Sequence, residues 1–74
     1  MTKDELRTKL IKYQVPKEVY SLKGGLANEI YCFGYLKGKW ETYYSERGIK
    51  TERKEFNTED EACNYFYNWI IDSL

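Results

Sequence analysis

The chain has 74 residues, about half the usual length of a domain, which favours a single domain over residues 1–74 with a thin core. Twelve basic residues balance twelve acidic ones and histidine is absent. This excludes a strong overall attraction to nucleic acid and any histidine-based catalytic or zinc site. No apolar run reaches the ~20 residues of a membrane span, and the first residues lack a signal-peptide stretch. We therefore expect a cytoplasmic protein with no membrane contact.

Residues 2–14 are predicted to form a helix. Thr2 and Glu5 have capping-box spacing, in which a hydroxyl and a carboxylate satisfy free backbone N–H groups at a helix start. Leu6, Leu10 and Tyr13 then recur at helical spacing. The helix is expected to end before Pro16, because the residue preceding proline is forced out of helical geometry.

Residues 29–36, 40–45 and 50–56 are rich in β-favouring residues and are predicted to be strands. Short turns at 37–39 and 46–49 join them, and Gly48 is expected to adopt a positive φ. Residues 18–22 are a further candidate, as an edge strand. The charged third strand is also expected at an edge.

Residues 58–74 are predicted to form a second helix. Thr58 and Glu61 repeat the capping-box spacing. An apolar stripe follows, and in a helix that closes a small domain such a stripe belongs to the core. The predicted fold is α+β: a helix, a three- to four-stranded antiparallel meander and a helix, with both helices packed on one face of the sheet. The stripe comprises Cys63, Phe66, Tyr67, Ile70 and Leu74.

Alternation along the strands suggests which aromatic residues are exposed. Trp40 and Tyr44 share one side of the second strand and are expected to pack inward, which turns Tyr43 outward. Together with the odd-numbered aromatics of the first strand, Tyr43 would form an exposed strip rimmed by charge, as in protein interfaces. The reverse assignment would expose Trp40 and Tyr44. The strip would comprise Tyr31, Phe33, Tyr35 and Tyr43, with Lys39, Glu41 and Arg47 at its rim.

The two cysteines, Cys32 and Cys63, lie far apart in the sequence and without metal-binding spacing. We expect both to be buried free thiols, since disulfides are rare in the cytoplasm. A catalytic cysteine would need a base, and no histidine can serve. The sequence therefore predicts no catalytic residue, metal or cofactor, and a protein that is not an enzyme.

Charge is unevenly distributed along the chain. Residues 1–39 carry a net charge of +4 and residues 40–74 a net charge of −4. Residues 55–74 hold five acidic residues and no basic one, including Glu59 and Asp60. Complementarity to the dipole at a helix start explains these two. An alternative explanation is an acidic surface that contacts a basic partner.

Three segments together resemble a family of small bacterial immunity proteins encoded beside polymorphic or contact-dependent toxins. They are Asn28–Cys32, an NExYC strand; Trp40–Lys50, a WExYYSERGxK hairpin; and Glu61–Phe66, an EACxYF helix. Thr42 departs from the pattern, which has an aliphatic residue there. The resemblance implies stoichiometric binding and neutralisation of a cognate protein toxin. The acidic end points to a nuclease, because nucleases have basic sites.

The residues assigned to partner binding combine the aromatic strip, the hairpin and the acidic helix start. Two alternatives remain open. Basic residues beside exposed aromatics are typical of a nucleic-acid-binding module, although zero net charge disfavours it. An exposed edge strand is typical of a homodimerising regulatory module, so the chain is expected to be a monomer or a weak homodimer. The assigned residues are Tyr31, Phe33, Tyr35, Glu41, Tyr43, Glu46, Arg47, Glu59 and Asp60.

Overall fold

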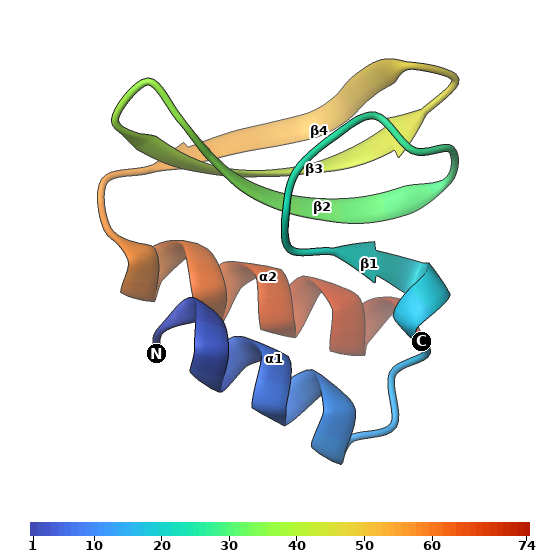
Figure 1. The fold of residues 1–74 in the computed structure, drawn as a ribbon, viewed down its shortest axis with the longest axis vertical. Helices are drawn as coiled ribbons and strands as arrows, with labels where there is room; N and C mark the ends of the chain where they lie inside the picture. Colours follow the sequence, from blue (N-terminus) through green and yellow to red (C-terminus); the bar gives the residue numbers. More distant parts are fainter.

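A computed structural model describes residues 1–74, in which two helices lie on the same side of one sheet (Figure 1). The 3-10 helix η1 precedes the short strand β1. The elements in chain order are α1 (Lys3–Lys12), η1 (Lys17–Val19), β1 (Tyr20–Ser21), β2 (Ile30–Leu36), β3 (Lys39–Glu46), β4 (Ile49–Phe56) and α2 (Glu59–Ser73).

Both helices begin where the capping signals predict. Thr2 caps α1, its hydroxyl accepts the Glu5 N–H, and Glu5 accepts the Thr2 N–H in return. Thr58 caps α2 and accepts the Glu61 N–H. The two starts lie at the same end of the molecule (Figure 1). Local sequence thus determines where the helices begin, before any tertiary contact is considered.

The four strands lie in the order β1-β2-β3-β4, so each neighbours the next in sequence. The pairs β2–β3 and β3–β4 are antiparallel, as predicted. The expectation of a wholly antiparallel meander is wrong, because β1 pairs with β2 in parallel. Residues 22–29 form a long connection that returns the chain to the start of β2, and this return makes the parallel pairing possible. The sheet is therefore mixed.

The two hairpins use the same tight turn. Lys37 and Gly38 have φ values of 53° and 80°, and Arg47 and Gly48 have 52° and 77°. Positive φ at both central residues defines the type I′ turn, whose twist matches that of paired strands. Glycine adopts this geometry without steric cost, which explains why it occupies the second position of each turn.

An irregularity in β4 changes which of its residues share a face. Register shifts between Thr42 and Tyr44, so Glu52 and Arg53 together lie opposite Tyr43. Glu52 takes the unusual φ of 52°. This is a β-bulge, in which one extra residue reverses the alternation. Arg53 therefore lies on the face away from the helices, where it reaches Glu41, whereas Thr51 is opposite Tyr44 on the helix-facing side.

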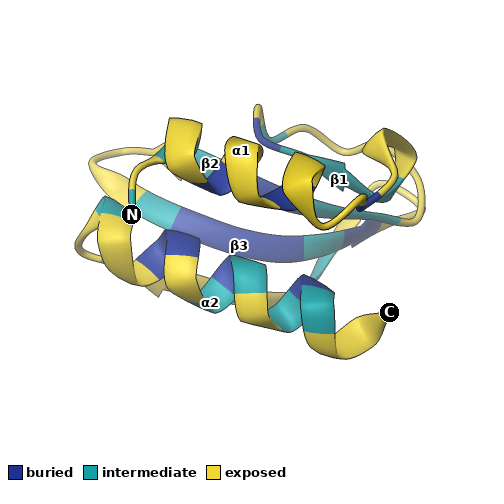
Figure 2. Ribbon diagram, turned by 90° about the horizontal axis from the view of Figure 1, so that it is seen from below, coloured by how far each residue is buried: buried dark blue, intermediate teal, exposed yellow.

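The main core lies between the helices and the sheet. Phe33 is fully buried and meets Phe66 of α2 edge to face, with ring centroids 5.6 Å apart. Leu6 and Leu10 of α1 join the same cluster. Buried positions follow the sheet-facing sides of both helices and the length of β3 (Figure 2). The predicted α2 stripe is confirmed at Cys63, Phe66 and Ile70, whereas Leu74 is exposed.

Neither helix is long and apolar enough to cross a membrane. Cys32 and Cys63 are both free and buried, as predicted. Burial raises the pKa of the Cys63 thiol to about 11, so it stays protonated and unreactive at neutral pH.

Candidate binding cleft on the sheet face away from the helices

The aromatic residues of β2 and β3 lie mostly on the helix-facing side. Tyr31 pairs with Tyr44 and Tyr35 with Trp40 across the two strands, so all four side chains share one face. Tyr31 contacts Trp69 of α2, with centroids 4.7 Å apart. The predicted exposed strip is therefore wrong, because it joined Tyr43 to the opposite face of the sheet. The reverse assignment, with Trp40 and Tyr44 exposed, is wrong as well, since both are half-buried.

Tyr43 lies on the other face of the sheet, yet only 1% of it is exposed. The connection at 22–29 covers it. The Tyr43 hydroxyl donates a hydrogen bond of 2.6 Å to the Gly25 carbonyl. Burial raises the pKa of Tyr43 to about 12, so the phenol remains a neutral donor. The sheet is thus covered on this side by a glycine loop instead of a helix.

Further hydrogen bonds fix this loop. The Gly24 N–H donates to the Phe33 carbonyl at 3.0 Å, and the Ser21 hydroxyl donates to the Gly24 carbonyl at 3.0 Å. A Cβ atom placed on Gly34 would lie 3.5 Å from the Gly24 Cα. The loop therefore rests directly on the strand, and the positive φ at position 24 explains the glycine there.

Glu41 is the one acidic residue buried on this face, with 4% exposed. Lys50 Nζ lies 3.0 Å from one carboxylate oxygen, and Arg53 Nε lies 2.7 Å from the other. Burial acts to raise the pKa of Glu41, but the hydrogen bonds from Lys50 and Arg53 outweigh it and the pKa is lowered. The carboxylate is therefore charged at neutral pH and positions both cations. Lys50 also lies 4.6 Å from the centre of the Tyr43 ring.

A shallow cleft of about 290 Å³ opens between the glycine loop and the β2–β3 hairpin. Its floor includes Gly34 and Tyr43. Two exposed leucines, Leu26 and Leu36, border it, and Lys23 and Lys50 supply positive charge. Exposed large apolar residues gathered beside a charged rim are the usual anatomy of a protein contact site. Tyr35 also borders the cleft, but its side chain lies on the helix-facing side of the sheet beside Trp40.

The predicted partner-binding residues divide by burial. Tyr35 is 59% exposed, but its ring lies 4.6 Å from the Trp40 ring on the helix-facing side of the sheet, so the side chain does not enter the cleft. Phe33 is buried in the main core and Tyr31 is packed on α2, so neither presents a free ring. Tyr43 and Glu41 lie at the cleft but beneath its surface. Tyr43 and Glu41 therefore support the cleft from below and do not form its exposed surface.

The remaining predicted residues lie away from the cleft. Glu46 and Arg47 are exposed at the β3–β4 turn, where the Arg47 backbone N–H donates to the Asn28 side chain at 2.9 Å. Glu59 accepts the Lys3 N–H at 2.9 Å, and Asp60 pairs with the N-terminal amine of Met1. These contacts join the starts of α1 and α2. Capping and pairing therefore account for Glu59 and Asp60, and the cleft does not include them.

Comparison of the chain with protein-family models, with curated proteins and with solved structures finds no match. The side chains of the cleft themselves indicate what it can do. Leu26 and Leu36 can make apolar contacts with a partner, and the ammonium groups of Lys23 and Lys50 can bind its acidic groups by hydrogen bonds and charge.

Sequence reasoning missed Leu26, Leu36 and Lys50 as site residues. Leu26 follows Gly24-Gly25, and an apolar residue within a glycine-containing connection was the available signal for a loop that packs on the sheet. Leu36 immediately precedes the Lys37-Gly38 turn, where a strand leaves the core. Lys50 could not be assigned, since its contact with Glu41 depends on the register of β4.

Proposed function

We propose that this protein is an immunity-type inhibitor that binds a cognate bacterial protein toxin stoichiometrically and occludes it. The observation that carries the proposal is the cleft, where Leu26 and Leu36 are exposed beside buried, fixed polar groups. The resemblance of the NExYC, WExYYSERGxK and EACxYF segments to immunity proteins supports the same function.

The rigidity of the cleft favours binding. Its floor is held by the Tyr43–Gly25 hydrogen bond and its wall by the Glu41–Lys50 and Glu41–Arg53 ion pairs. A surface already held in one conformation loses little entropy when a partner docks. Exposed aliphatic side chains on such a surface provide the apolar contact that anchors an interface.

Charge complementarity suggests which partner surface the cleft fits. Lys23 and Lys50 line it, and Lys37 and Lys39 lie in the adjoining turn. Glu41 neutralises only part of this charge, so the cleft favours an apolar toxin segment that carries a carboxylate. We propose insertion of such a segment between the glycine loop and the β2–β3 hairpin.

We further propose that the toxin is a nuclease. This part of the proposal rests on acidic residues outside the cleft. Asp4, Glu5 and Asp60 are exposed carboxylates at the adjoining helix starts. Hydrogen bonds from Thr2 lower the pKa of Glu5, and the N-terminal amine lowers that of Asp60. Glu5 and Asp60 therefore remain charged in mildly acidic conditions. They would attract a basic toxin over long range.

The test begins with a tagged chain as bait in a lysate of its native bacterium, followed by mass spectrometry. A recovered protein is then expressed alone in a neutral host, with and without the chain, and growth is measured. The proposal predicts that the captured protein is toxic and that the chain restores growth at equal stoichiometry. Capture of a protein that is harmless when expressed alone would contradict it.

Matched variants locate the contact. Leu36→Asp places charge at the apolar border of the cleft and is expected to abolish protection, whereas Ile49→Asp makes the same change at the other hairpin and should leave protection intact. Both residues are exposed, so neither change should unfold the chain. Loss of protection by Ile49→Asp alone would move the interface to the β3–β4 turn.

A further inference from the structure

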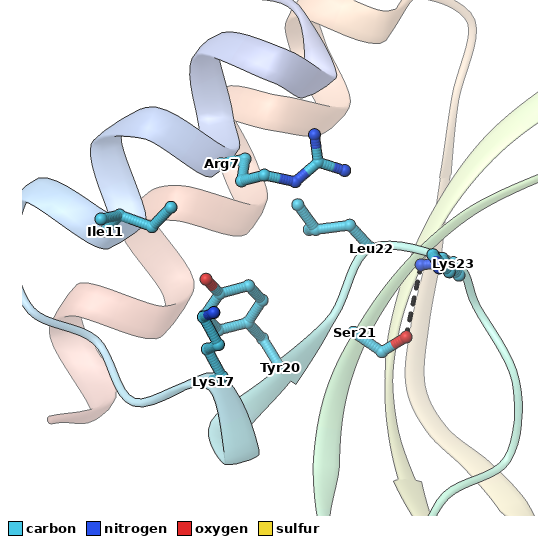
Figure 3. A pocket seen from close by; sticks show the side chains of 7 residues that line it. All are labelled: Arg7, Ile11, Lys17, Tyr20, Ser21, Leu22 and Lys23. Atoms are coloured by element: carbon cyan, nitrogen blue, oxygen red, sulfur yellow. Dashed lines mark hydrogen bonds between the residues drawn. The ribbon is translucent and has the colours of Figure 1, made fainter.

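A second cavity lies between α1 and the η1–β1 segment, at the border of the main core. Its volume is about 480 Å³, within the range of small-molecule sites. Figure 3 shows Arg7 and Ile11 extending from α1, while Lys17 and Tyr20 extend toward α1 from the opposite wall. Leu22 and Ser21 complete that wall, and Lys23 lies beyond them.

Three cationic side chains line this cavity, and no carboxylate does. Arg7 belongs to α1, Lys17 to η1 and Lys23 to the loop after β1, so three separate segments each contribute one cation to the lining. Lys17 and Lys23 have no acidic partner within ion-pair distance, and Arg7 contacts only Asp4, whose side chain is 89% exposed. The cations are thus available to an anion.

Ile11, Leu22 and the aromatic ring of Tyr20 form the apolar part of the lining. Ile11 is 54% exposed beside the cavity, Leu22 is buried at its base, and the half-buried Tyr20 ring forms part of its wall. An aromatic ring and two branched aliphatic side chains favour a planar, weakly polar group. Cationic side chains beside an apolar, aromatic wall are complementary to a molecule that carries both a phosphate and a planar ring.

We propose that this cavity binds a small phosphorylated ligand of the mononucleotide type. Arg7, Lys17 and Lys23 hold the phosphate by charge-assisted hydrogen bonds, and the flat ring lies against Tyr20 and Ile11. The proposal is independent of toxin binding. Lys23 borders both the cavity and the cleft, so the experiment uses Arg7 and Lys17.

The test is a titration of the isotope-labelled full chain with adenosine monophosphate, followed by NMR shifts of backbone amides. Shifts are expected to concentrate at residues 7–11 and 17–23, and added salt should weaken binding. Adenosine and inorganic phosphate, each supplying one half of the ligand, should bind at least about tenfold more weakly. Adenosine binding as tightly as the monophosphate would overturn the proposal, as would equal binding of inorganic phosphate.

Variants separate the cavity from general positive charge. Arg7→Gln and Lys17→Gln should each weaken binding about tenfold, because a charge-assisted hydrogen bond is lost. Lys12→Gln removes the same charge from α1 outside the cavity lining and should change affinity less than about twofold. An equal loss in Lys12→Gln would overturn the proposal, as would the absence of shifts at 7–11 and 17–23. Circular dichroism confirms that each variant is folded.

Discussion

The two faces of the sheet are buried by different means. On the helix-facing side, Phe33 is covered by Phe66 and by the leucines of α1, all of them apolar. On the opposite side, Tyr43 is covered by the glycine loop, and Glu41 is covered by its two cationic partners. The first face depends on apolar area, and the second on a few directed polar contacts.

The helix-facing side therefore contributes mainly to stability, and the opposite side carries the candidate binding cleft. Apolar packing contributes most of the folding free energy and is insensitive to pH, whereas buried ion pairs contribute less and depend on protonation. The face that carries the cleft is therefore the one whose stability solution conditions can change. Five substitutions test that contrast, beginning with the most destabilising.

Phe33→Ala should have the largest effect, lowering the free energy of unfolding by about 3–5 kcal/mol, because it leaves a cavity against Phe66. Urea denaturation followed by circular dichroism measures the loss. Tyr35→Ala, on the same strand but 59% exposed, should cost less than about 1 kcal/mol. If Phe33→Ala does not fold, Phe33→Leu should still cost more than Tyr35→Ala. Equal costs would mean that the helix side is not the main core.

Glu41→Gln should cost about 1–3 kcal/mol at pH 7, because Lys50 and Arg53 lose the carboxylate they share. The pKa of Glu41 is lowered in the fold, so its contribution is present above the ordinary value of 4.5 and is lost as pH falls through the lowered pKa. Urea midpoints of wild type and variant should therefore converge in acid. A difference that stays constant down to pH 3 would contradict this account.

Tyr43→Phe should cost about 1 kcal/mol through loss of the hydrogen bond to Gly25. The folded pKa of about 12 exceeds the ordinary 10.0, so this phenol favours the fold below pH 10 and its contribution is lost as pH rises toward 12. Thermal melts at alkaline pH should show a smaller decline for the variant than for wild type. Parallel declines would mean that Tyr43 ionises as an exposed tyrosine does.

Thr42→Val should increase stability by about 1 kcal/mol, because the Thr42 hydroxyl is buried without a hydrogen-bond partner. This is the position at which the immunity-protein pattern has an aliphatic residue. Thr51→Val serves as the control, since the Thr51 hydroxyl donates to the Tyr44 carbonyl at 3.0 Å. Thermal midpoints should rise for the first variant and not for the second.

Gly34→Ala should have the smallest effect, under about 0.5 kcal/mol. Its Cβ would meet the Gly24 Cα at 3.5 Å, an ordinary contact, and alanine restricts the unfolded chain more than glycine does. Gly24→Ala should cost more, about 1 kcal/mol, because Gly24 has a φ of 70°. Denaturation midpoints in the opposite order would show that the loop does not rest on β2 as described.

Much of the architecture could be predicted from local sequence signals. Capping boxes at Thr2 and Thr58 located both helices, and the glycine turns located both hairpins. The facing of the strands could not be predicted, since aromatic residues occur on both sides of β3. Non-local contacts decide it: the β2–β3 register places Tyr31 beside Tyr44, and the bulge at Glu52 redirects Arg53.

The candidate site was predicted only in part for the same reason. Glu41 and Tyr43 were identified but lie beneath the cleft, and Tyr35 was identified but its side chain lies on the helix-facing side of the sheet. The position of the glycine loop depends on hydrogen bonds between residues far apart in sequence, such as Tyr43 to Gly25, which are 18 residues apart. Neither hydrophobic periodicity nor turn composition carries that information.

The pairing of α1 with α2 has a consequence for synthesis on the ribosome. Leu6 and Leu10 share their core cluster with Phe66 and Ile70, which are translated much later. Until those residues leave the exit tunnel, the first helix lacks the apolar surface of α2, and a helix of ten residues is marginal by itself. The core of this domain therefore cannot close until α2 has emerged.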